Sequence, residues 1–318
     1  MSRLIADVGG TNIRFAVVSG SDLLTEPATL ACAAYPGIVE AAQDYLARHA
    51  EGARFDEAAF AVAGAVTGDW IDITNSHWAF SQAEVKRQLG VRRQKFLNDF
   101  TALALGVPHL PMESALALND ASPVKESPIA VIGPGTGLGV SGLLPDGKQG
   151  WVPIAGEGGH ATLAIRTERE FLVVAEAEKR FGHCSAERLV SGPGLSVLAD
   201  ILDHLDGRTS SPRSPAEISE RALAGDCPVS TEAMSLFLGF LGTTASNLAL
   251  TLGAFGGLYL AGGILPRLGA DYLKGSPLIT RFTDKGRYRD YLSAIPLKLV
   301  VHPLPAFLGL GNLPIGDA

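Results

Sequence analysis

The sequence contains few cysteines and has no excess of positive charge. Only three of its 318 residues are cysteines, Cys32, Cys184 and Cys227, and they lie far apart. An odd, scattered set excludes a disulfide framework and a paired-cysteine metal clip. The 26 Lys and Arg residues are outnumbered by 33 Asp and Glu residues, which gives a net charge of −7. We therefore expect neither nucleic acid nor an anionic membrane as a partner.

The sequence also lacks a long apolar start. Its first apolar run, before Asp7, is three residues and is too short for the core of a signal peptide. A charge-free stretch from Ala233 to Pro266 exceeds the roughly 20 residues that cross a membrane, but hydroxyl residues and a series of glycines interrupt it. We predict a buried helix at about 232–252, a glycine turn and a buried strand at 258–261. The expected protein is reduced and cytoplasmic.

Two strand–turn–strand units about 125 residues apart organise the chain. The first spans residues 4–18 around the turn at 9–12, and the second spans 129–144 around the turn at 133–139. Apolar and β-branched runs on both sides of glycines are the signal of a hairpin. Because a domain takes roughly 150 residues, this length and repetition predict two similar α/β halves.

The remaining pattern predicts alternating helices and strands. Helices are expected near 37–50, 100–105, 168–181, 195–205, 215–224, 231–252 and 305–313, and strands near 59–63, 95–97, 258–261 and 297–302. We expect the last strand and helix to return to the first half. The predicted smaller domain is therefore 1–109 plus 300–318, and the larger one is 110–299.

The first glycine turn is a candidate phosphate site. Glycines let the backbone approach phosphate oxygens, consecutive N–H groups bind anions, and the Thr11 hydroxyl adds a donor. Asp7, at the end of a buried strand, suits a magnesium ion held through water. The residues assigned to the nucleotide here are Ala6, Asp7, Val8, Gly9, Gly10, Thr11 and Asn12. The alternative is a plain Gly-Gly hairpin in which Asp7 accepts hydrogen bonds from the turn.

Two further glycine turns follow strands. Gly135 and Thr136 are the expected second side of a phosphate clamp, although a tight structural corner has the same composition. Gly262 and Gly263 follow a buried strand, where small residues would let an adenine or ribose lie against the backbone. Three such turns together are more specific than any one of them.

Two familiar patterns in this region are coincidental. Residues 137–142 match GxGxxG, but β-forming residues follow where a dinucleotide-binding turn needs a helix. Residues 142–148 match GxxxxGK, but Gln149 stands where a hydroxyl would bind magnesium. Neither pattern predicts a nucleotide site.

Taken together, six segments resemble the bacterial glucokinase family in order along the chain. They are DVGGTN at 7–12, LNDFTALA at 97–104, GPGTGLGV at 133–140, PIAGEGGH at 153–160, HCSAERLVSGPG at 183–194 and FGGLYLAGGILPR at 255–267. The resemblance implies an actin/hexokinase-like (ribonuclease H-like) duplicated fold with two domains around a cleft. It also implies ATP- and Mg²⁺-dependent phosphorylation of glucose at its 6-hydroxyl, and a homodimer.

The same resemblance implies roles for single residues. Asp99 matches the carboxylate that accepts the proton of the sugar 6-hydroxyl, beside a sugar-binding Asn98. Sugar-binding positions of the family correspond to Glu157, His160 and Glu187, and we place Gly137 with them. The residues alone leave other roles open, since Asp99 could cap a helix, His160 could be structural and Glu187 solvated. Pro134 and Pro153 depart from the family pattern without touching an assigned side chain.

Other functions are left open by the sequence. A related kinase could act on fructose, mannose or an N-acetylhexosamine, and kinases of the ROK (repressor, ORF, kinase) group typically carry a zinc-binding cysteine cluster. Here His183-Cys184 has no second cysteine nearby, so we expect no structural zinc. A non-catalytic actin-fold filament or sugar-sensing regulator is the alternative from another class. The phosphoryl donor, ATP or ADP, is not specified by any of these residues.

Overall fold

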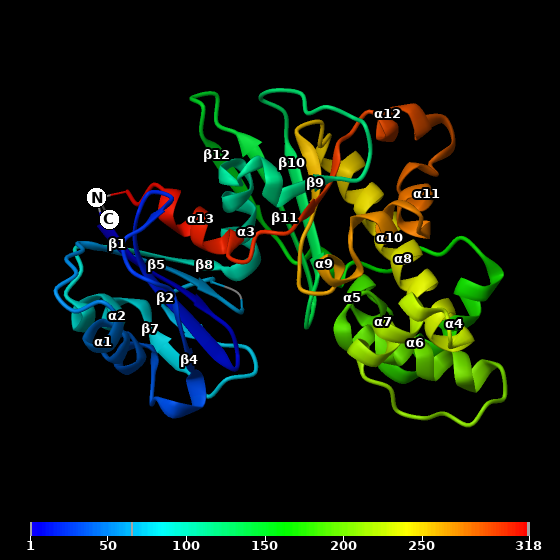
Figure 1. The fold of residues 1–318 in the computed structure, drawn as a ribbon, viewed down its shortest axis with the longest axis horizontal. Helices are drawn as coiled ribbons and strands as arrows, with labels where there is room; N and C mark the ends of the chain where they lie inside the picture. The colour runs from blue at the N-terminus through cyan, green and yellow to red at the C-terminus, as the bar shows by residue number, and fades with distance from the viewer. Residues whose placement is uncertain (1, 65, 317–318) are drawn as a thin grey trace. The chain divides into compact units, whose positions relative to one another are not determined.

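The computed structural model describes residues 2–64 and 66–316. It divides into two compact units: Met1–Pro111 with His302–Ala318 form unit 1, and Met112–Val301 form unit 2. The chain leaves unit 1 once and returns to it near the end (Figure 1). Each boundary between the units lies two residues further along the chain than the boundary expected from the sequence.

Unit 1 is built on a six-stranded sheet in the order β3-β2-β1-β5-β8, with β4 paired to β2. Its main strands are β1 (Ser2–Val8), β2 (Asn12–Ser19), β5 (Glu57–Val62) and β8 (Arg93–Asn98). Strands β1 and β2 are antiparallel, whereas β1, β5 and β8 run parallel to one another. The carboxyl ends of the three parallel strands therefore meet at one edge of the sheet.

Two pairs of helices cover the two faces of this sheet. Helices α1 (Ile38–His49) and α2 (Gln82–Leu89) lie on one face, and α3 (Asp99–Gly106) and α13 (Pro305–Asn312) lie on the other (Figure 1). Alternation along the strands produces this division. Leu4, for example, packs in the cluster that includes α1 and α2, while the equally buried Ile5 lies outside that cluster.

Unit 2 repeats the arrangement. Its sheet has the order β12-β11-β10-β13-β14-β9, with β10 and β11 antiparallel and β10, β13 and β14 parallel. These strands are β9 (Ala115–Ala117), β10 (Ile129–Pro134), β11 (Leu138–Pro145), β12 (Trp151–Ala155), β13 (Gly257–Leu260) and β14 (Leu297–Val300). The repeated strand–turn–strand start followed by two parallel strands confirms the predicted duplicated α/β fold.

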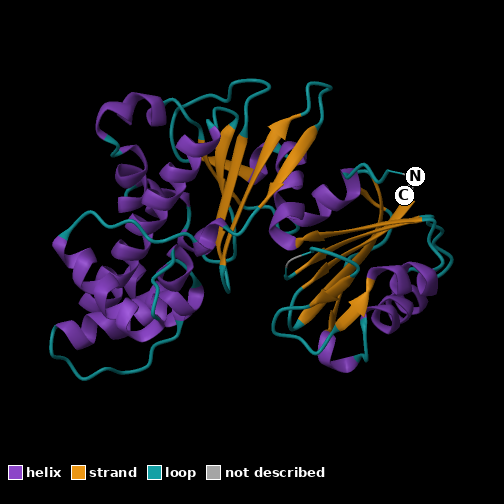
Figure 2. Cartoon of the chain, turned by 180° about the vertical axis from the view of Figure 1, so that it is seen from behind, coloured by secondary structure: helices purple, strands orange, loops and turns teal. Residues whose placement is uncertain are grey.

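Most of the helices in unit 2 lie on one side of its sheet (Figure 2). The longer helices are α4 (Glu168–Phe181), α6 (Gly192–Leu205), α7 (Pro215–Ala224), α8 (Pro228–Leu252) and α11 (Pro277–Thr283). The bounds of α4 and α7 are those predicted from the sequence. Helices α6 and α8 each begin three residues before their predicted starts, at Gly192 and Pro228.

Helix α8 contains the first part of the charge-free stretch, and by length and composition alone it could cross a membrane. In the structure, 67% of its most apolar window of 18 residues is buried. The hydroxyls of Thr243 and Thr244 donate to the carbonyls of Gly239 and Phe240, one turn earlier in the same helix. These contacts satisfy the polar groups internally, and α8 is largely buried in unit 2, as predicted for this segment.

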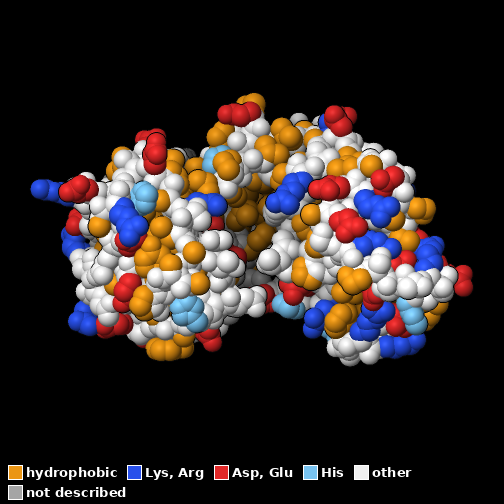
Figure 3. Space-filling model, turned by 60° about the horizontal axis from the view of Figure 1, so that its bottom comes forward, with side chains coloured by type: hydrophobic (Ala, Val, Ile, Leu, Met, Phe, Trp, Pro, Cys, Tyr) orange, Lys and Arg blue, Asp and Glu red, His pale blue; other side chains and the backbone are white. Residues whose placement is uncertain are grey.

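Several short elements complete the fold. They are β3 (Asp22–Leu23), β4 (Ala28–Ala31), β6 (Trp70–Asp72), β7 (Ala79–Ser81), α5 (Ala186–Leu189), α9 (Leu265–Leu268), α10 (Ala270–Lys274), α12 (Arg289–Ser293) and the single turns η1 (Cys32–Ala34), η2 (Val107–His109), η3 (Met112–Ser114), η4 (Gly158–His160) and η5 (Gly286–Tyr288). On the face drawn in Figure 3, acidic and basic side chains are interspersed over both units. That mixed surface is consistent with the small negative net charge.

Candidate active site

The first glycine turn joins β1 to β2 in unit 1. The amide of Gly9 donates to the carbonyl of Asn12 at 2.9 Å and closes the hairpin. A Cβ on Gly10 would lie 2.6 Å from the Thr74 carbonyl oxygen and 2.9 Å from that of Asn75. Gly10 is therefore required by the neighbouring backbone of residues 74–75. This is a structural reason for the glycine that holds whether or not phosphate binds here.

Asp7 stands at the end of β1, opposite Arg14 of β2. Burial raises the pKa of the Asp7 carboxyl, and the charge of Arg14 opposes that rise. Within the described parts of the chain, no hydrogen bond reaches the Asp7 carboxylate. A partly buried acid with a counter-charge on the neighbouring strand and free lone pairs is suited to a hydrated cation.

Asn98 and Asp99 lie at the same sheet edge as the first turn. Val8 is in register with Val62, and Val62 with Asn98, across the three parallel strands. The Asn98 Oδ1 accepts from the amides of Phe100 and Thr101 at 3.0 and 3.2 Å, so Asn98 is the N-cap of α3. Capping is therefore carried out by Asn98, and Asp99 is the first residue of the helix.

In unit 2, Glu187 joins the second turn to the glycine loop. Its Oε2 accepts the amide hydrogen bond of Leu138 at 2.8 Å, and its Oε1 lies 3.8 Å from His160 Nε2. A Cβ on Gly137 would lie 2.4 Å from the same Oε2. Three predicted sugar-binding residues, Gly137, His160 and Glu187, are thus brought together.

The loop around Glu157 is held by close backbone contact. A Cβ on Gly159 would lie 2.1 Å from the Leu138 carbonyl oxygen, and one on Gly158 would lie 2.7 Å from Val140 Cγ1. Both glycines let η4 lie directly on the start of β11. Glu157 precedes this turn with its side chain exposed, and its carbonyl accepts from the His160 amide at 3.0 Å.

The third glycine turn packs against the second. A Cβ on Gly262, which has a φ of +88°, would lie 2.3 Å from the Pro134 carbonyl oxygen. The amide of Gly192, the first residue of α6, donates to the Gly135 carbonyl at 2.7 Å. Gly262 and Gly263 therefore lie beside Gly135 and Thr136, at the carboxyl ends of β10 and β13.

Sequence reasoning missed a cavity that adjoins these turns. It has a volume of about 270 Å³ and is lined by Pro215, Ala216, Ser219, Glu220 and Leu223 of α7 and by Ile264, Arg267 and Leu268. A Cβ on Gly192 would lie 3.9 Å from Pro215 Cγ and 4.0 Å from Ile264 Cδ1. Because the Gly192 amide also bonds to Gly135, the cavity begins next to the second turn. Its only sequence signal is the Pro and Ser cluster before α7.

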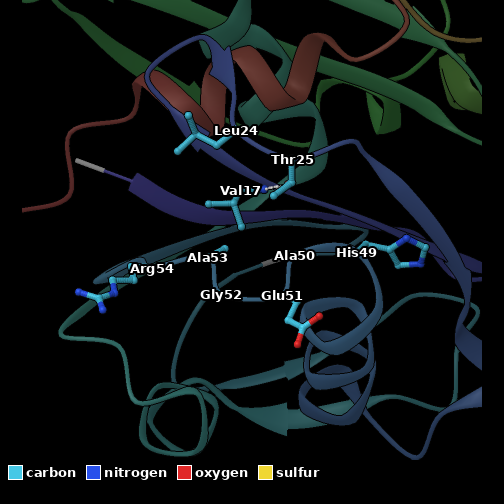
Figure 4. Close-up of a pocket in the computed structure, with 9 residues that line it drawn as sticks. All are labelled: Val17, Leu24, Thr25, His49, Ala50, Glu51, Gly52, Ala53 and Arg54. Atoms are coloured by element: carbon cyan, nitrogen blue, oxygen red, sulfur yellow. Dashed lines mark hydrogen bonds between the residues drawn. The ribbon is translucent and has the colours of Figure 1, made fainter.

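A second hollow lies in unit 1 (Figure 4). Its volume is about 390 Å³, and it is lined by Val17, Leu24 and Thr25 and by the loop 49–54. The Val17 amide donates to the Thr25 hydroxyl at 2.8 Å on its wall. These lining residues do not overlap with the predicted site residues, so we leave this hollow out of the candidate site.

Known proteins match this sequence over nearly its whole length. A family model described as Glucokinase matches residues 4–314. The glucokinase of Paramagnetospirillum magneticum is 47% identical over 98% of this chain and 96% of its own length. That of Neisseria meningitidis serogroup C is 44% identical over 96% and 93%. The chain belongs to the glucokinase family.

Solved glucokinase structures share the fold. A glucokinase from an Antarctic psychrotroph superposes with a TM-score of 0.88, at 32% identity and with 98% of both chains covered. A Balamuthia mandrillaris glucokinase in complex with glucose gives 0.79 at 22% identity, covering 98% of this chain and 92% of the other. A ROK hexokinase from Thermus thermophilus gives 0.67 at 18% identity, covering 98% and 97%. The predicted actin/hexokinase-like fold and family are both confirmed.

Proposed function

We propose that this protein is a glucokinase that transfers the γ-phosphoryl group of ATP to the 6-hydroxyl of D-glucose, giving glucose 6-phosphate and ADP. The observation that carries the proposal is the match, at 44–47% identity and over nearly the whole chain, to proteins named glucokinase. A ROK family glucokinase from Streptomyces griseus with the same fold was solved in complex with glucose and AMPPNP, an ATP analogue.

Asp99 is the proposed general base. The sugar 6-oxygen attacks the γ-phosphorus, its proton passes to an Asp99 carboxylate oxygen, and the bond from the γ-phosphorus to the ADP oxygen breaks. Phosphoryl transfer depends mainly on positioning and charge stabilisation. Asp99 Oδ1 already accepts the Phe100 amide at 2.7 Å, which orients the carboxylate at the start of α3.

The sugar is assigned to Asn98, Gly137, Glu157, His160 and Glu187. Carboxylate oxygens and an imidazole nitrogen supply the acceptors that neighbouring sugar hydroxyls need. In Glu187 the two oxygens have separate tasks, since Oε2 is used by the Leu138 amide and Oε1 faces His160. We assign Oε1 to a sugar hydroxyl.

The nucleotide is assigned to the three glycine turns. The phosphates lie against the turn 6–12 and against Gly135 and Thr136, where backbone amides and threonine hydroxyls donate. The ribose lies against Gly262 and Gly263. The partly apolar cavity between α7 and Ile264 takes the adenine, because it adjoins these turns and has the mixed lining of a base pocket.

Magnesium fits this set of residues at Asp7. The partly buried carboxylate, with its raised pKa and unused lone pairs, would hold the hydrated ion that accompanies ATP. Bound magnesium would neutralise phosphate charge. The surrounding residues orient the phosphates through the turn amides.

Cellular location and assembly follow the family expectation. We propose a cytoplasmic homodimer whose small-molecule substrates are glucose and ATP. Light scattering coupled to size-exclusion chromatography measures the assembly directly, and a monomer at micromolar concentration would contradict the dimer.

A coupled assay over a panel of hexoses and donors tests the function. We expect glucose with ATP to give the highest kcat/KM, whereas a higher value with fructose, mannose or an N-acetylhexosamine would assign a different substrate. Asp99→Asn should lower kcat by roughly 10²–10⁴-fold, the usual contribution of a general base. Glu168→Gln is the matched control, because Glu168 is also an acidic first residue of a helix, α4. Equal activity of the two variants would remove Asp99 from the chemistry.

A further inference from the structure

Helices α3 and α13 cross at a distance that only glycine permits. A Cβ on Gly309 of α13 would lie 2.0 Å from the Ala102 carbonyl oxygen and 2.8 Å from the Gly106 amide nitrogen of α3. A Cβ on Gly106 would lie 2.0 Å from the Pro305 carbonyl oxygen and 3.2 Å from the Gly309 amide nitrogen. The crossing is therefore made by backbone on backbone and leaves no room for a side chain.

The contact is reciprocal. In an α-helix each amide bonds to the carbonyl four residues earlier, so the Ala102 carbonyl and Gly106 amide form one hydrogen bond of α3. The Pro305 carbonyl and Gly309 amide form the corresponding bond of α13. Each glycine thus lies on a backbone hydrogen bond of the other helix, and neither helix can rotate or slide without a collision of backbone atoms.

The far end of α13 is fixed to the sheet. Arg3 of β1 donates from its Nη1 to the carbonyls of Leu310 and Gly311, at 2.5 and 3.3 Å. Its Nη2 forms a 2.6 Å ion pair with Glu57 of β5, which Arg93 of β8 also contacts. Burial raises the pKa of Glu57, but Arg3 and Arg93 more than offset this, and the pKa lies below its usual value. Three adjacent strands therefore hold α13 through one buried charge network.

This chain of contacts ends at the proposed general base. Asp99 is the first residue of α3, so the position of the helix axis sets the position of the carboxylate. We infer that Gly106 and Gly309 are positioning residues that hold Asp99 at its working distance from the sugar 6-hydroxyl, with Arg3 fixing the helix against which they act. This inference rests on the proposed function.

Each of the two helices adjoins, in the sequence, one of the two connections between the units, and this explains why a rigid helix crossing would be useful. The connection from unit 1 to unit 2 follows α3 at Pro111, and the return connection at His302 precedes α13. A pull on either connection is thus transmitted first to one of these two helices. Because the helices are interlocked, such a pull would move them together with their sheet, and Asp99 would keep its place beside the first phosphate turn.

The test compares alanine at three glycines. Gly309→Ala and Gly106→Ala each place a methyl group on the partner helix. Gly242→Ala is the matched control, because its Cβ would lie 2.4 Å from the Leu278 carbonyl oxygen, a similarly close crossing of two helices, α8 and α11, that belongs to unit 2. A general loss of packing would affect all three alike.

Steady-state kinetics should separate them. Gly309→Ala and Gly106→Ala must displace α3 by about 1 Å, and a misplacement of that size lowers kcat by about 10- to 100-fold. The KM for ATP should stay within about threefold of the wild-type value, because the first turn lies on β1 and β2 rather than on α3. Gly242→Ala should keep kcat within about threefold.

Hydrogen exchange gives a readout that does not depend on activity. The amides of residues 101–106 should exchange faster in Gly309→Ala than in Gly242→Ala. If Gly309→Ala fails to fold, Arg3→Lys, which keeps the charge but loses the fork of donors, should lower kcat in the same selective way. Equal kcat in the alanine variants at 309 and 242, or equal exchange in α3, would overturn the inference. A wild-type protein that phosphorylates no hexose would refute the proposed function, while the exchange comparison would still decide whether α13 holds α3.

Discussion

Gly135 and Gly137 belong to one turn, and alanine at the two positions should have opposite consequences. Neither glycine has a positive φ, so alanine is compatible with the backbone at both. At Gly137 the new methyl group would lie 2.4 Å from Glu187 Oε2, whereas at Gly135 no heavy atom of the described chain lies within 4 Å of it. One substitution therefore acts on a proposed sugar-binding residue. The other enters the open space assigned to phosphate.

The size of the Gly137→Ala effect follows from these distances. An ordinary contact needs the Glu187 oxygen to retreat by about 1 Å, which lengthens its 2.8 Å hydrogen bond from Leu138 beyond bonding range. A hydrogen bond to a charged group contributes about 1.5–3 kcal/mol. If the moved carboxylate loses one such bond to glucose, the glucose affinity falls by about 10- to 150-fold. The Leu138 amide also loses its partner, so Tm should fall.

Titration calorimetry with glucose, together with the KM for ATP, separates the two variants. Gly137→Ala should weaken glucose binding and leave the KM for ATP nearly unchanged. Gly135→Ala should raise the KM for ATP and leave glucose binding intact. If Gly137→Ala binds glucose as tightly as the wild type while its Tm falls, Glu187 is a structural acceptor for the Leu138 amide, and its assignment to the sugar is wrong.

Three further predictions concern Asp7, zinc and the cavity beside α7. Because burial raises the pKa of Asp7 above its ordinary value of 3.8, folding favours the protonated form, and stability is lost as the pH rises through the folded pKa. Asp7→Asn should therefore raise Tm at pH 7 without magnesium, lose that advantage below pH 3.8 and abolish activity; an unchanged Tm at pH 7 would contradict the burial argument. A zinc chelator should leave folding and activity intact once magnesium is restored, and tightly bound stoichiometric zinc in the purified protein would contradict this. Ala216→Phe should fill the cavity beside α7 and raise the KM for ATP at least about tenfold, whereas Ala224→Phe, on the same helix but outside the lining, should not; equal KM values would move the adenine elsewhere.

Local signals predicted the long elements well. Thr167 and Gly182 flank α4, and Ser214 and Gly225 flank α7, as N-cap and C-terminal glycine residues should, and both helices have the predicted bounds. Helix α2 has the same signals, Ser81 and Gly90, but it has only eight mostly polar residues, of which Val85 alone is buried. The region 270–293 forms α10, α11, η5 and α12, each of seven residues or fewer, which is too short for a periodic pattern to develop.

The candidate site was predictable to the extent that its residues lie in contiguous segments. The turn at 7–12, the pair Asn98 and Asp99 and the loop 156–160 each stand out as runs of unusual composition. The cavity beside α7 does not, because its lining combines ordinary residues of a helix with three residues that follow a strand some 40 positions later. Only the folded chain brings them together.

The glycines show where sequence reasoning ends. In the turn at 9–12 a cluster of glycines predicts a phosphate site, yet Gly10 is also required by the carbonyls of Thr74 and Asn75, so the composition alone does not separate the two causes. Gly106 and Gly309 are the opposite case. Gly106 is the last residue of α3 and Gly309 lies within α13, neither belongs to a glycine turn after a strand, and 203 positions separate them in the numbering. Their close contact depends on both glycines together, so the sequence around either one alone does not predict it. The residues proposed to carry out the chemistry were predicted from local sequence, whereas the glycines proposed to hold Asp99 in place could be identified only from the structure.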